Sequence, residues 1–199
     1  MRAKGFMTIY FDTETTGLAP GRIIELAYVL DYGDRVEGKN FFFAVDYVPV
    51  EASKIHGITT EKLKVLSKGK TFSDYADEIQ EDFLKADLIV AHNVKFDLNF
   101  INAEFSYLDL EFKFNEILDT MKYFTPILKI LRKSGGYKYP KLSEVSESLG
   151  IYPYDATRFC REIFNEQDLS FHDARFDVAI LYLSVKAQAE RDENLKAIV

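Results

Sequence analysis

The chain has 199 residues, of which 47% are hydrophobic and 29% charged, and its formal net charge is −7 at pH 7. This composition excludes a disordered, collagen-like or coiled-coil chain, and the acidic balance excludes a generally basic protein that coats nucleic acid. No stretch approaches the ~18 apolar residues of a membrane span, and a single cysteine, Cys160, fits a reducing compartment. We therefore expect one soluble domain over residues 1–199, located in the cytoplasm and without a membrane partner.

The first third of the chain predicts three β-strands. Residues 6–11 are almost continuously apolar, which is typical of a strand buried on both faces, and residues 12–17 are expected to form a loop. Two further apolar runs, at 23–30 and 40–47, are separated by short links rich in turn residues. Short links favour antiparallel neighbours, so this part of the chain predicts a three-stranded meander.

Helical spacing of apolar residues then takes over. A capping box is expected at residues 71–74, and Gly150 is expected to end a short helix. Strands followed by strand–helix alternation predict an α/β fold, a mixed sheet with helices packed on it. The elements expected here are a strand at 88–91 and helices near 72–83, 98–108, 142–149 and 174–190.

Asp12 and Glu14 follow the first predicted strand and are two residues apart. A strand has a period of two, which places both side chains on one face. Ligands of open α/β sheets bind beyond the carboxyl ends of strands, and a divalent cation would relieve the repulsion between the two carboxylates. As an alternative, both residues are solvated loop acids or helix caps.

Two later segments carry acids at predicted helix starts. Asp97 follows the strand at 88–91, where the helix dipole favours a negative charge, so plain helix stabilisation is one interpretation. Asp177 lies near the edge of the core-facing stripe of the last helix, and His172 precedes it by five residues. A carboxylate in that position is costly unless it is paired or bound to metal. The alternative is a capping segment with an exposed histidine.

The four acids are more informative together than alone. Carboxylate oxygens are hard ligands that suit Mg²⁺ or Mn²⁺, and no His/Cys cluster with zinc spacing is present. Four carboxylates match a two-metal site for phosphoryl displacement, which also needs a base for the attacking water. A histidine, with an ordinary pKa near 6.5, suits that role, and His172 is the candidate.

Three motifs resemble those of the DnaQ-like, DEDDh-type 3′→5′ exonucleases. They are Asp-Thr-Glu-Thr-Thr-Gly-Leu at 12–18, His-Asn-x-x-Phe-Asp at 92–97 and His-x-Ala-x-x-Asp at 172–177. The His-Gly-Ile segment at 56–58 and the Leu-Asp-Thr segment at 118–120 agree with the same family. The resemblance implies an RNase H-like fold with a five-stranded mixed sheet flanked by helices.

The resemblance also implies roles for particular residues. Two Mg²⁺ or Mn²⁺ ions would be held by four carboxylates, and His172 would act as general base in hydrolysis of the terminal phosphodiester, releasing a nucleoside 5′-monophosphate. The substrate would be the 3′ end of single-stranded DNA or RNA. The implied metal ligands are Asp12, Glu14, Asp97 and Asp177; the implied substrate-binding residues are Thr13, Thr15 and Leu18, with His56 and Asn93 in contacts or support of the site.

Two stretches are unusual in this context. Residues 152–171 lengthen the connection before His172 relative to many family members, and they predict an extra helix that either flanks the site or lies on the periphery.

The second stretch is 120–143, where basic residues are interleaved with tyrosines. This pattern favours contact with a phosphate backbone, although a solvated basic loop is the alternative. Between 120 and 143 the chain has no acid and six such residues, Lys122, Lys129, Arg132, Lys133, Lys138 and Lys141.

Several functions stay open within this class. A DNA polymerase is one candidate partner for a proofreading role, beside RNA end-trimming and the scavenging of short oligonucleotides. The chain ends at Val199, soon after the last predicted helix, which favours a free-standing enzyme or a short substrate. A non-catalytic nucleic-acid-binding or polymerase-associated module is the alternative from another class, and a phosphatase with Asp12 as covalent nucleophile is a third. The sequence leaves the oligomeric state open.

Overall fold

The computed structural model describes residues 5–166, 169 and 171–199. No helix within these ranges is long and apolar enough to span a membrane. The elements are β1 (Thr8–Thr15), β2 (Ile23–Asp31), β3 (Val36–Phe42), α1 (Val50–His56), α2 (Thr60–Ser67), the 3₁₀ turn η1 (Phe72–Asp74), α3 (Ala76–Lys85), β4 (Leu88–Ala91), α4 (Val94–Tyr107), β5 (Glu116–Asp119), α5 (Thr120–Leu128), α6 (Leu142–Leu149), α7 (Pro153–Ile163), α8 (Ala174–Ala189) and α9 (Glu193–Ile198).

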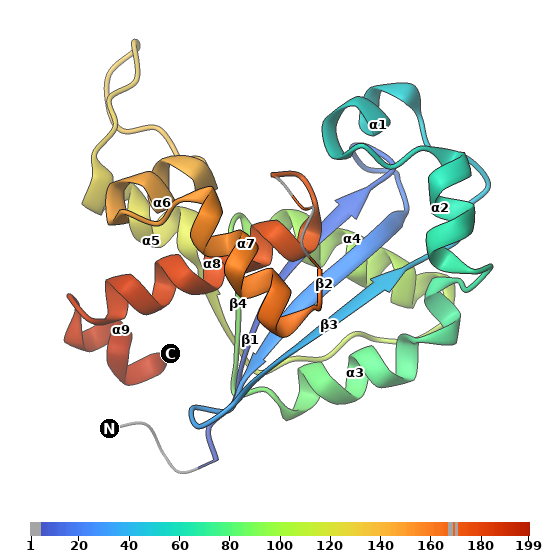
Figure 1. Cartoon of the computed structure of the whole chain (residues 1–199), viewed down its shortest axis with the longest axis horizontal. Helices are drawn as coiled ribbons and strands as arrows, with labels where there is room; N and C mark the ends of the chain where they lie inside the picture. Colours follow the sequence, from blue (N-terminus) through green and yellow to red (C-terminus); the bar gives the residue numbers. More distant parts are fainter. Residues whose placement is uncertain (1–4, 167–168, 170) are drawn as a thin grey trace.

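The described strands form one mixed sheet in the order β3-β2-β1-β4-β5. The first three strands pair antiparallel, whereas β1, β4 and β5 run parallel (Figure 1). The predicted meander and the predicted strand at 88–91 are confirmed. Because β1 is central, it is buried on both faces, and the residues at its carboxyl end are within reach of helices from both layers.

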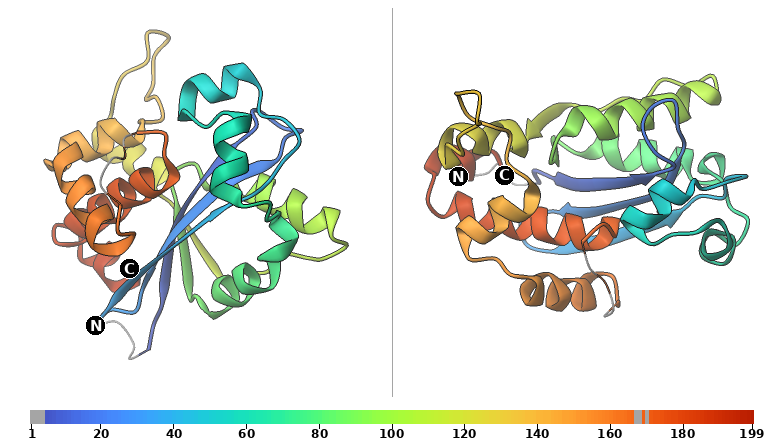
Figure 2. Two further views of the ribbon diagram at one scale, coloured as in Figure 1. Left: turned by 45° about the vertical axis from the view of Figure 1, so that its right-hand side comes forward. Right: turned by 90° about the horizontal axis from the view of Figure 1, so that it is seen from above.

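Helices cover both faces of the sheet. Alternation along β1 sends Ile9 and Phe11 into a core with α3 and α4, and Tyr10 into a second core with α8. Seen from above, the strands lie between these two helical layers, and α7 covers the outer side of α8 (Figure 2, right). The final turn of α7 also packs on β3, where a Cβ on Gly38 would come within 2.5 Å of Ile163.

The structure corrects two of the predicted boundaries. Residues 12–15, which were expected to lie in a loop, belong to strand β1. They pair with β2 as far as Thr15↔Ile23. The third strand covers Val36–Phe42 rather than 40–47, since it pairs with β2 as far as Asp31↔Val36. The helices at 98–108, 142–149 and 174–190 are confirmed within a few residues. The helix predicted at 72–83 is divided, because the capping box at Thr71 begins the short turn η1 and the α-helix starts only at Ala76.

The segment 152–171 contains the predicted extra helix, α7. Residues 167, 168 and 170 of this segment lie outside the described ranges. Ala156 and Cys160 bury the inner face of α7 against Phe176 and Ile180 of α8. Tyr152 and Tyr154 at its start are exposed. The helix is therefore a covering layer for α8, which is the peripheral arrangement of the two that were expected.

Candidate active site

Two acids enter the site from the central strand. Asp12 and Glu14 alternate with buried Thr13 and Thr15, so both point to the side of the sheet that α8 covers. The parallel ladder between β1 and β4 runs from Thr8↔Leu88 to Tyr10↔Val90. The carboxyl-terminal half of β1 therefore extends past β4 and leaves room beside Asp12 for side chains from the loops and helices that follow.

Asp97 fills that room from the first turn of α4. Its Oδ1 accepts hydrogen bonds from the Thr13 backbone N–H at 3.1 Å and from the Thr13 hydroxyl at 2.7 Å. The first bond satisfies a strand N–H at a position beyond the ladder to β4. Asp97 is only 3% exposed, so these contacts fix its carboxyl group next to Asp12.

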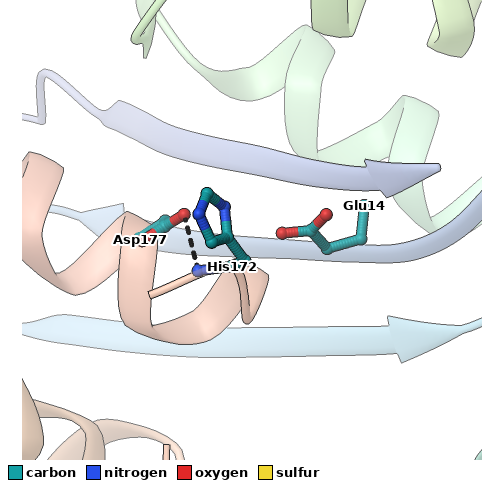
Figure 3. A group of neighbouring side chains, drawn as sticks. All are labelled: Glu14, His172 and Asp177. Atoms are coloured by element: carbon teal, nitrogen blue, oxygen red, sulfur yellow. Dashed lines mark hydrogen bonds between the residues drawn. The ribbon is translucent and has the colours of Figure 1, made fainter. Parts of the chain in front are cut away.

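The third group of residues comes from the start of α8. Asp173 caps the helix, and His172 just before it adopts a left-handed conformation with φ of 68°. The His172 backbone N–H donates to Oδ2 of Asp177 at 3.2 Å. Figure 3 shows the imidazole between the carboxyl groups of Asp177 and Glu14, and one potential ligand atom from each of the three residues lies within 4.8 Å of the others.

Burial and like charge disfavour full ionisation of these acids. Burial, and after it the charges of Asp177 and Glu25, raises the pKa of Glu14 to about 9. Burial raises the pKa values of Asp97 and Asp177 to about 7 each. The pKa of Asp12 is raised well above its usual value, first by burial and then by the neighbouring Asp97. Such a cluster is stable as a set of anions only when cations neutralise it.

A further acid, Glu25, was missed by the sequence reasoning. It lies opposite Glu14 in the β1–β2 ladder and is completely buried. Its nearest described counter-charge is Arg175 on α8, with Nε 3.4 Å from Oε1, while burial and Asp173 raise the pKa of Glu25 to about 8. The sequence did not reveal Glu25 as a site residue, because it stands within the apolar run at 23–30. Nothing in that run indicates that its carboxylate faces Glu14 across the sheet.

A hollow of about 190 Å³ adjoins the acids. Sites that enclose a drug-sized ligand start near ~300 Å³, so this hollow has room for about one nucleotide base. Four of the five predicted substrate-binding residues line it, and Asn93 is not among its described lining. The lining comprises Thr13, Glu14, Thr15, Gly17, Leu18, Ala52, Ile55, His56 and Phe96.

The predicted substrate-binding residues play different parts within this region. Leu18 is 83% exposed and projects at the rim, whereas Thr13 is buried and uses its hydroxyl to hold Asp97. His56 is also buried, and its Nδ1 accepts a hydrogen bond from the Ile58 N–H. Burial lowers the pKa of His56. Sequence reasoning missed Phe96, which packs against Phe100 with ring centroids 5.0 Å apart.

Asn93 belongs to the turn that presents Asp97. It has a left-handed φ of 73°, a conformation that asparagine tolerates, and its backbone N–H donates to Oδ1 of Asp119 at 3.2 Å. Asp119 also caps α5 through the Met121 N–H. Next to this turn, His92 bridges the Thr120 hydroxyl and the Pro140 carbonyl at 3.0 and 2.9 Å. These residues join the two parallel strand ends rather than line the hollow.

A second hollow, of about 870 Å³, lies between α4 and β5. Its lining includes Lys95, Asp119 and Lys122, and neither His172 nor any of the four predicted metal ligands. The acids and the histidine are therefore not part of this second hollow. At this end of the sheet the acids offer hard oxygen ligands, and His172 offers an imidazole nitrogen.

Comparison with known proteins gives the family context of this geometry. The model of the family RNase_T, described as an exonuclease family, matches residues 9–152. The matched region contains Asp12, Glu14 and Asp97 but ends before His172 and Asp177. The contribution of α8 therefore rests on the geometry of the chain itself.

The chain spans about half the length of the epsilon subunits that it matches. It is 41% identical over 123 residues to the DNA polymerase III subunit epsilon of Rickettsia prowazekii, covering 57% of this chain and 51% of that protein. It is 30% identical over 177 residues to the PolC-type DNA polymerase III of Halalkalibacterium halodurans, covering 83% of this chain and 12% of that protein.

Solved structures support the same fold. E. coli Exonuclease I in complex with a dT13 oligonucleotide superposes with a TM-score of 0.74 at 18% identity, over 96% of this chain and 42% of that one. The apo form of Exonuclease I gives a TM-score of 0.73 at 19% identity. The order β3-β2-β1-β4-β5 is thus that of an RNase H-like fold, as expected from the motifs.

Proposed function

Because the chain belongs to the RNase_T family of exonucleases, of the DnaQ-like, DEDDh type, we propose that it is a metal-dependent 3′→5′ exonuclease whose catalytic domain covers residues 1–199. One observation carries the proposal. Acids from β1, α4 and α8 converge with His172 at the carboxyl end of the central strand, beside a hollow that fits one base. No structural purpose accounts for so many buried acids close together, since each raises the cost of ionising the others.

The described residues fit two divalent cations. Oδ1 of Asp177 is buried and has no hydrogen-bond partner in the described part of the chain, so it is available to a ligand. We assign Asp12, Glu14, Asp97 and Asp177 as ligands of Mg²⁺ or Mn²⁺, which prefer carboxylate oxygens. When bound, the ions would neutralise the acids and stabilise the charge that develops on the phosphoryl group.

The chain's own residues then divide the remaining tasks. His172 takes the proton of the attacking water, whose oxygen forms a bond to phosphorus while the bond from phosphorus to O3′ of the preceding nucleotide breaks. The O3′ atom leaves and takes up a proton, so the products are a strand shortened by one nucleotide and a nucleoside 5′-monophosphate. Asp177 holds the His172 backbone through the bond at 3.2 Å, which fixes where the imidazole can reach.

The hollow suits the 3′-terminal nucleotide. Leu18 and Ile55 are exposed apolar side chains, and Phe96 adds an aromatic wall, so a base can pack between them. His56 and the Thr13–Thr15 segment border the same space, while Asn93 supports the turn before α4. E. coli Exonuclease I, which has a similar fold, binds dA16 and dT13 oligonucleotides, so we propose single-stranded DNA as the first substrate to test, with RNA as the comparison.

The test uses a single strand labelled at its 5′ end, as DNA and as RNA, with Mg²⁺, with Mn²⁺ or with EDTA. We expect a ladder that shortens by one nucleotide at a time from the 3′ end, in the presence of either metal and not in EDTA. The faster of the two strands identifies the preferred sugar. Strand binding without digestion under any metal would instead favour a non-catalytic nucleic-acid-binding module.

Association with a DNA polymerase is a second level of the proposal. The relatives described above are a DNA polymerase III subunit and a PolC-type DNA polymerase III, which favours a partner that delivers the 3′ end. The expected observation is co-elution of the purified protein with the replicative polymerase of the same cell on a sizing column. Separate elution at micromolar concentrations would favour a free-standing nuclease.

Thr13→Val removes the hydroxyl that donates to Asp97 and leaves the backbone bond in place. Groups that orient metal ligands typically contribute 10–100-fold to metal affinity or activity, so we expect the metal concentration for half-maximal digestion to rise by about that factor. The measurement is the digestion rate across a Mg²⁺ titration. Thr13→Ser, which keeps the donor, is the matched control, and an unchanged titration curve for Thr13→Val would contradict this role.

The raised pKa values also predict how stability depends on pH. The folded-state pKa of Glu14, about 9, and those of Asp97 and Asp177, about 7, exceed the usual values of 4.5 and 3.8. The folded state therefore holds protons that the unfolded state has released, and stability falls as the pH rises through this window. In EDTA we expect a loss of several kcal/mol between pH 5 and pH 9, since each pH unit between the unfolded-state and folded-state pKa values of one acid contributes about 1.4 kcal/mol.

Thermal unfolding at several pH values measures this loss. Millimolar Mg²⁺ or Mn²⁺ should reduce it, because the cations replace the bound protons and stabilise the folded state. A metal-free protein that is equally stable at pH 5 and pH 9 would contradict the electrostatic description of the site.

A further inference from the structure

A basic arm projects from the molecule between α5 and α6, formed by residues 129–141. Its two sides pair through the bridge Leu131↔Tyr137 and through hydrogen bonds from Arg132 N to Gly136 O at 2.9 Å and from Lys138 N to Ile130 O at 2.8 Å. The left-handed φ values of Gly135 and Gly136 make the tight turn at its tip. The arm is therefore an ordered two-sided structure, drawn in yellow and tan at the top of Figure 1.

The arm contributes little to the core. Residues 131–137 are all exposed, and Leu131 and Tyr139 are 75% and 53% exposed respectively. Tyr139 lies beneath the guanidinium of Arg132, 5.8 Å from the ring centroid. An extension that buries so little apolar surface adds little to stability, and its exposed aromatic rings are available to a partner.

Charge distinguishes the arm from the rest of the surface. It carries Lys129, Arg132, Lys133, Lys138 and Lys141 without an acid, in a chain of net charge −7. Lys138 is engaged with Glu144. Lys129, Arg132 and Lys133 are exposed and make no ion pair with any described residue. None of these three cations therefore has to break an ion pair with a described residue to bind an anionic ligand, and Arg132 is held over the Tyr139 ring.

The arm is joined to the candidate active site at its base. The Pro140 carbonyl, at the end of the arm, accepts a hydrogen bond from His92 Nε2, and His92 precedes the turn that leads to Asp97. In the left view of Figure 2 the arm, in tan, and α1, in teal, rise at the same end of the molecule. A strand whose 3′ end lies near α1, at His56, can thus continue towards the arm.

We propose that the basic arm binds the sugar–phosphate backbone of a single nucleic-acid strand, on the 5′ side of the nucleotide held in the hollow. This inference rests on the proposed function, because the strand is that of the exonuclease substrate. Lys129, Arg132 and Lys133 contact phosphates, and Tyr137 and Tyr139 stack on bases. The arm supplies the positive charge that the acidic chain otherwise lacks, and it makes affinity depend on strand length.

The test compares two variants of equal net charge. In the arm variant Lys129→Gln, Arg132→Gln and Lys133→Gln are combined; in the control, Lys64→Gln, Lys85→Gln and Lys113→Gln remove three exposed lysines elsewhere. Affinity for a 5′-fluorescent 20-nucleotide oligothymidylate is measured by anisotropy in EDTA, from 50 to 300 mM salt. Circular dichroism and thermal unfolding verify that both variants are folded.

We expect the arm variant to bind on the order of 100-fold more weakly near 0.1 M salt, with a log–log salt slope that is shallower by about 2, since each phosphate contact on a single strand contributes ~0.7. The control should bind like the original protein. Equal loss in both variants would mean that only net charge matters, and no loss in either would mean that the strand avoids the arm. Either result would overturn the proposal.

Hydrolysis of thymidine 5′-monophosphate p-nitrophenyl ester separates this proposal from the proposed function. The ester has no strand to reach the arm, so the arm variant should hydrolyse it at the rate of the original protein. Failure of the original protein to hydrolyse either ester or strand would argue against the nuclease, while the anisotropy result would still decide whether the arm binds nucleic acid.

Discussion

Asp12→Asn is expected to reduce metal-dependent digestion by three to four orders of magnitude and to make the metal-free protein more stable. Asp12 is the acid whose ionisation is opposed by burial and by the charges of Asp97, Asp177 and Glu14. A metal ion supplies several kcal/mol to phosphoryl transfer, and 1.36 kcal/mol corresponds to a factor of ten in rate. The amide removes a ligand charge and therefore most of that contribution.

The same substitution relieves repulsion in the absence of metal. At pH 8 and in EDTA we expect the Tm to rise by a few degrees, because ~1 kcal/mol shifts the Tm of a domain of this size by about 2–4 °C. The gain should be smaller near pH 5, because burial and the neighbouring acids raise the pKa of Asp12 and so favour its neutral form in the folded state as the pH falls. The measurements are the 5′-labelled strand assay and thermal unfolding at both pH values.

If Asp12→Asn were inactive and also less stable, loss of folding could explain the lost activity. A loss of digestion together with a higher Tm excludes that explanation. Thr125→Ala is a suitable control, since it removes a hydroxyl bonded to the Met121 carbonyl in α5, outside the acid cluster. It should digest normally. Digestion by Asp12→Asn at a normal rate would remove Asp12 from the set of metal ligands.

Arg175→Met is expected to destabilise the fold by about 3–5 kcal/mol at pH 8, the usual effect of removing one partner from a buried ion pair. The Arg175 side chain is 11% exposed and makes bonds of 3.0 and 2.9 Å to the Asp173 carboxylate. It is also the described counter-charge of Glu25, which lies in the sheet with no exposed surface. Without the guanidinium, the folded protein has to keep Glu25 protonated or leave a buried charge uncompensated.

The pH dependence of this loss identifies its cause. At pH 5 the loss should be smaller, because the folded-state pKa of Glu25, about 8, keeps this group neutral there even in the original protein. The double variant Glu25→Gln, Arg175→Met should recover much of the stability that the single variant loses at pH 8. Urea unfolding of the four proteins gives the coupling free energy. Additive effects would show that Arg175 acts through packing and its bonds to Asp173 alone.

The sequence predicted the site better than it predicted local structure near it. Asp12 and Glu14 on one face, Asp97 in the first turn of a helix and His172 outside the last helix are all placed as expected. These features follow from short-range periodicity and from motifs. The prediction of a loop at 12–17 was wrong for residues 12–15. These residues form a strand because they pair with β2, and no local sequence pattern indicates that contact.

Other features depend on tertiary contacts in the same way. Glu25 stands in an apolar run, and only its partner across the ladder and Arg175 from a distant helix reveal its place in the cluster. The helices α1 and α2 were not predicted, although α1 ends at His56 and its residues Ala52 and Ile55 form one wall of the hollow. Their apolar positions are few, with Leu63 the buried apolar residue of α2, so periodicity gave little signal.

The distance along the chain between the assembled acids has a consequence for synthesis. Asp12 and Asp177 are 165 positions apart. Strand β1 lies between two helical layers, and α8 belongs to one of them. Contacts of such long range form late, after the loop between them has closed. During synthesis the chain therefore carries Asp12 and Glu14 without His172 and Asp177 until those later residues have been made, and the acid cluster is complete only when α8 docks. The proposed nuclease activity is in this way delayed until α8 has packed on the sheet.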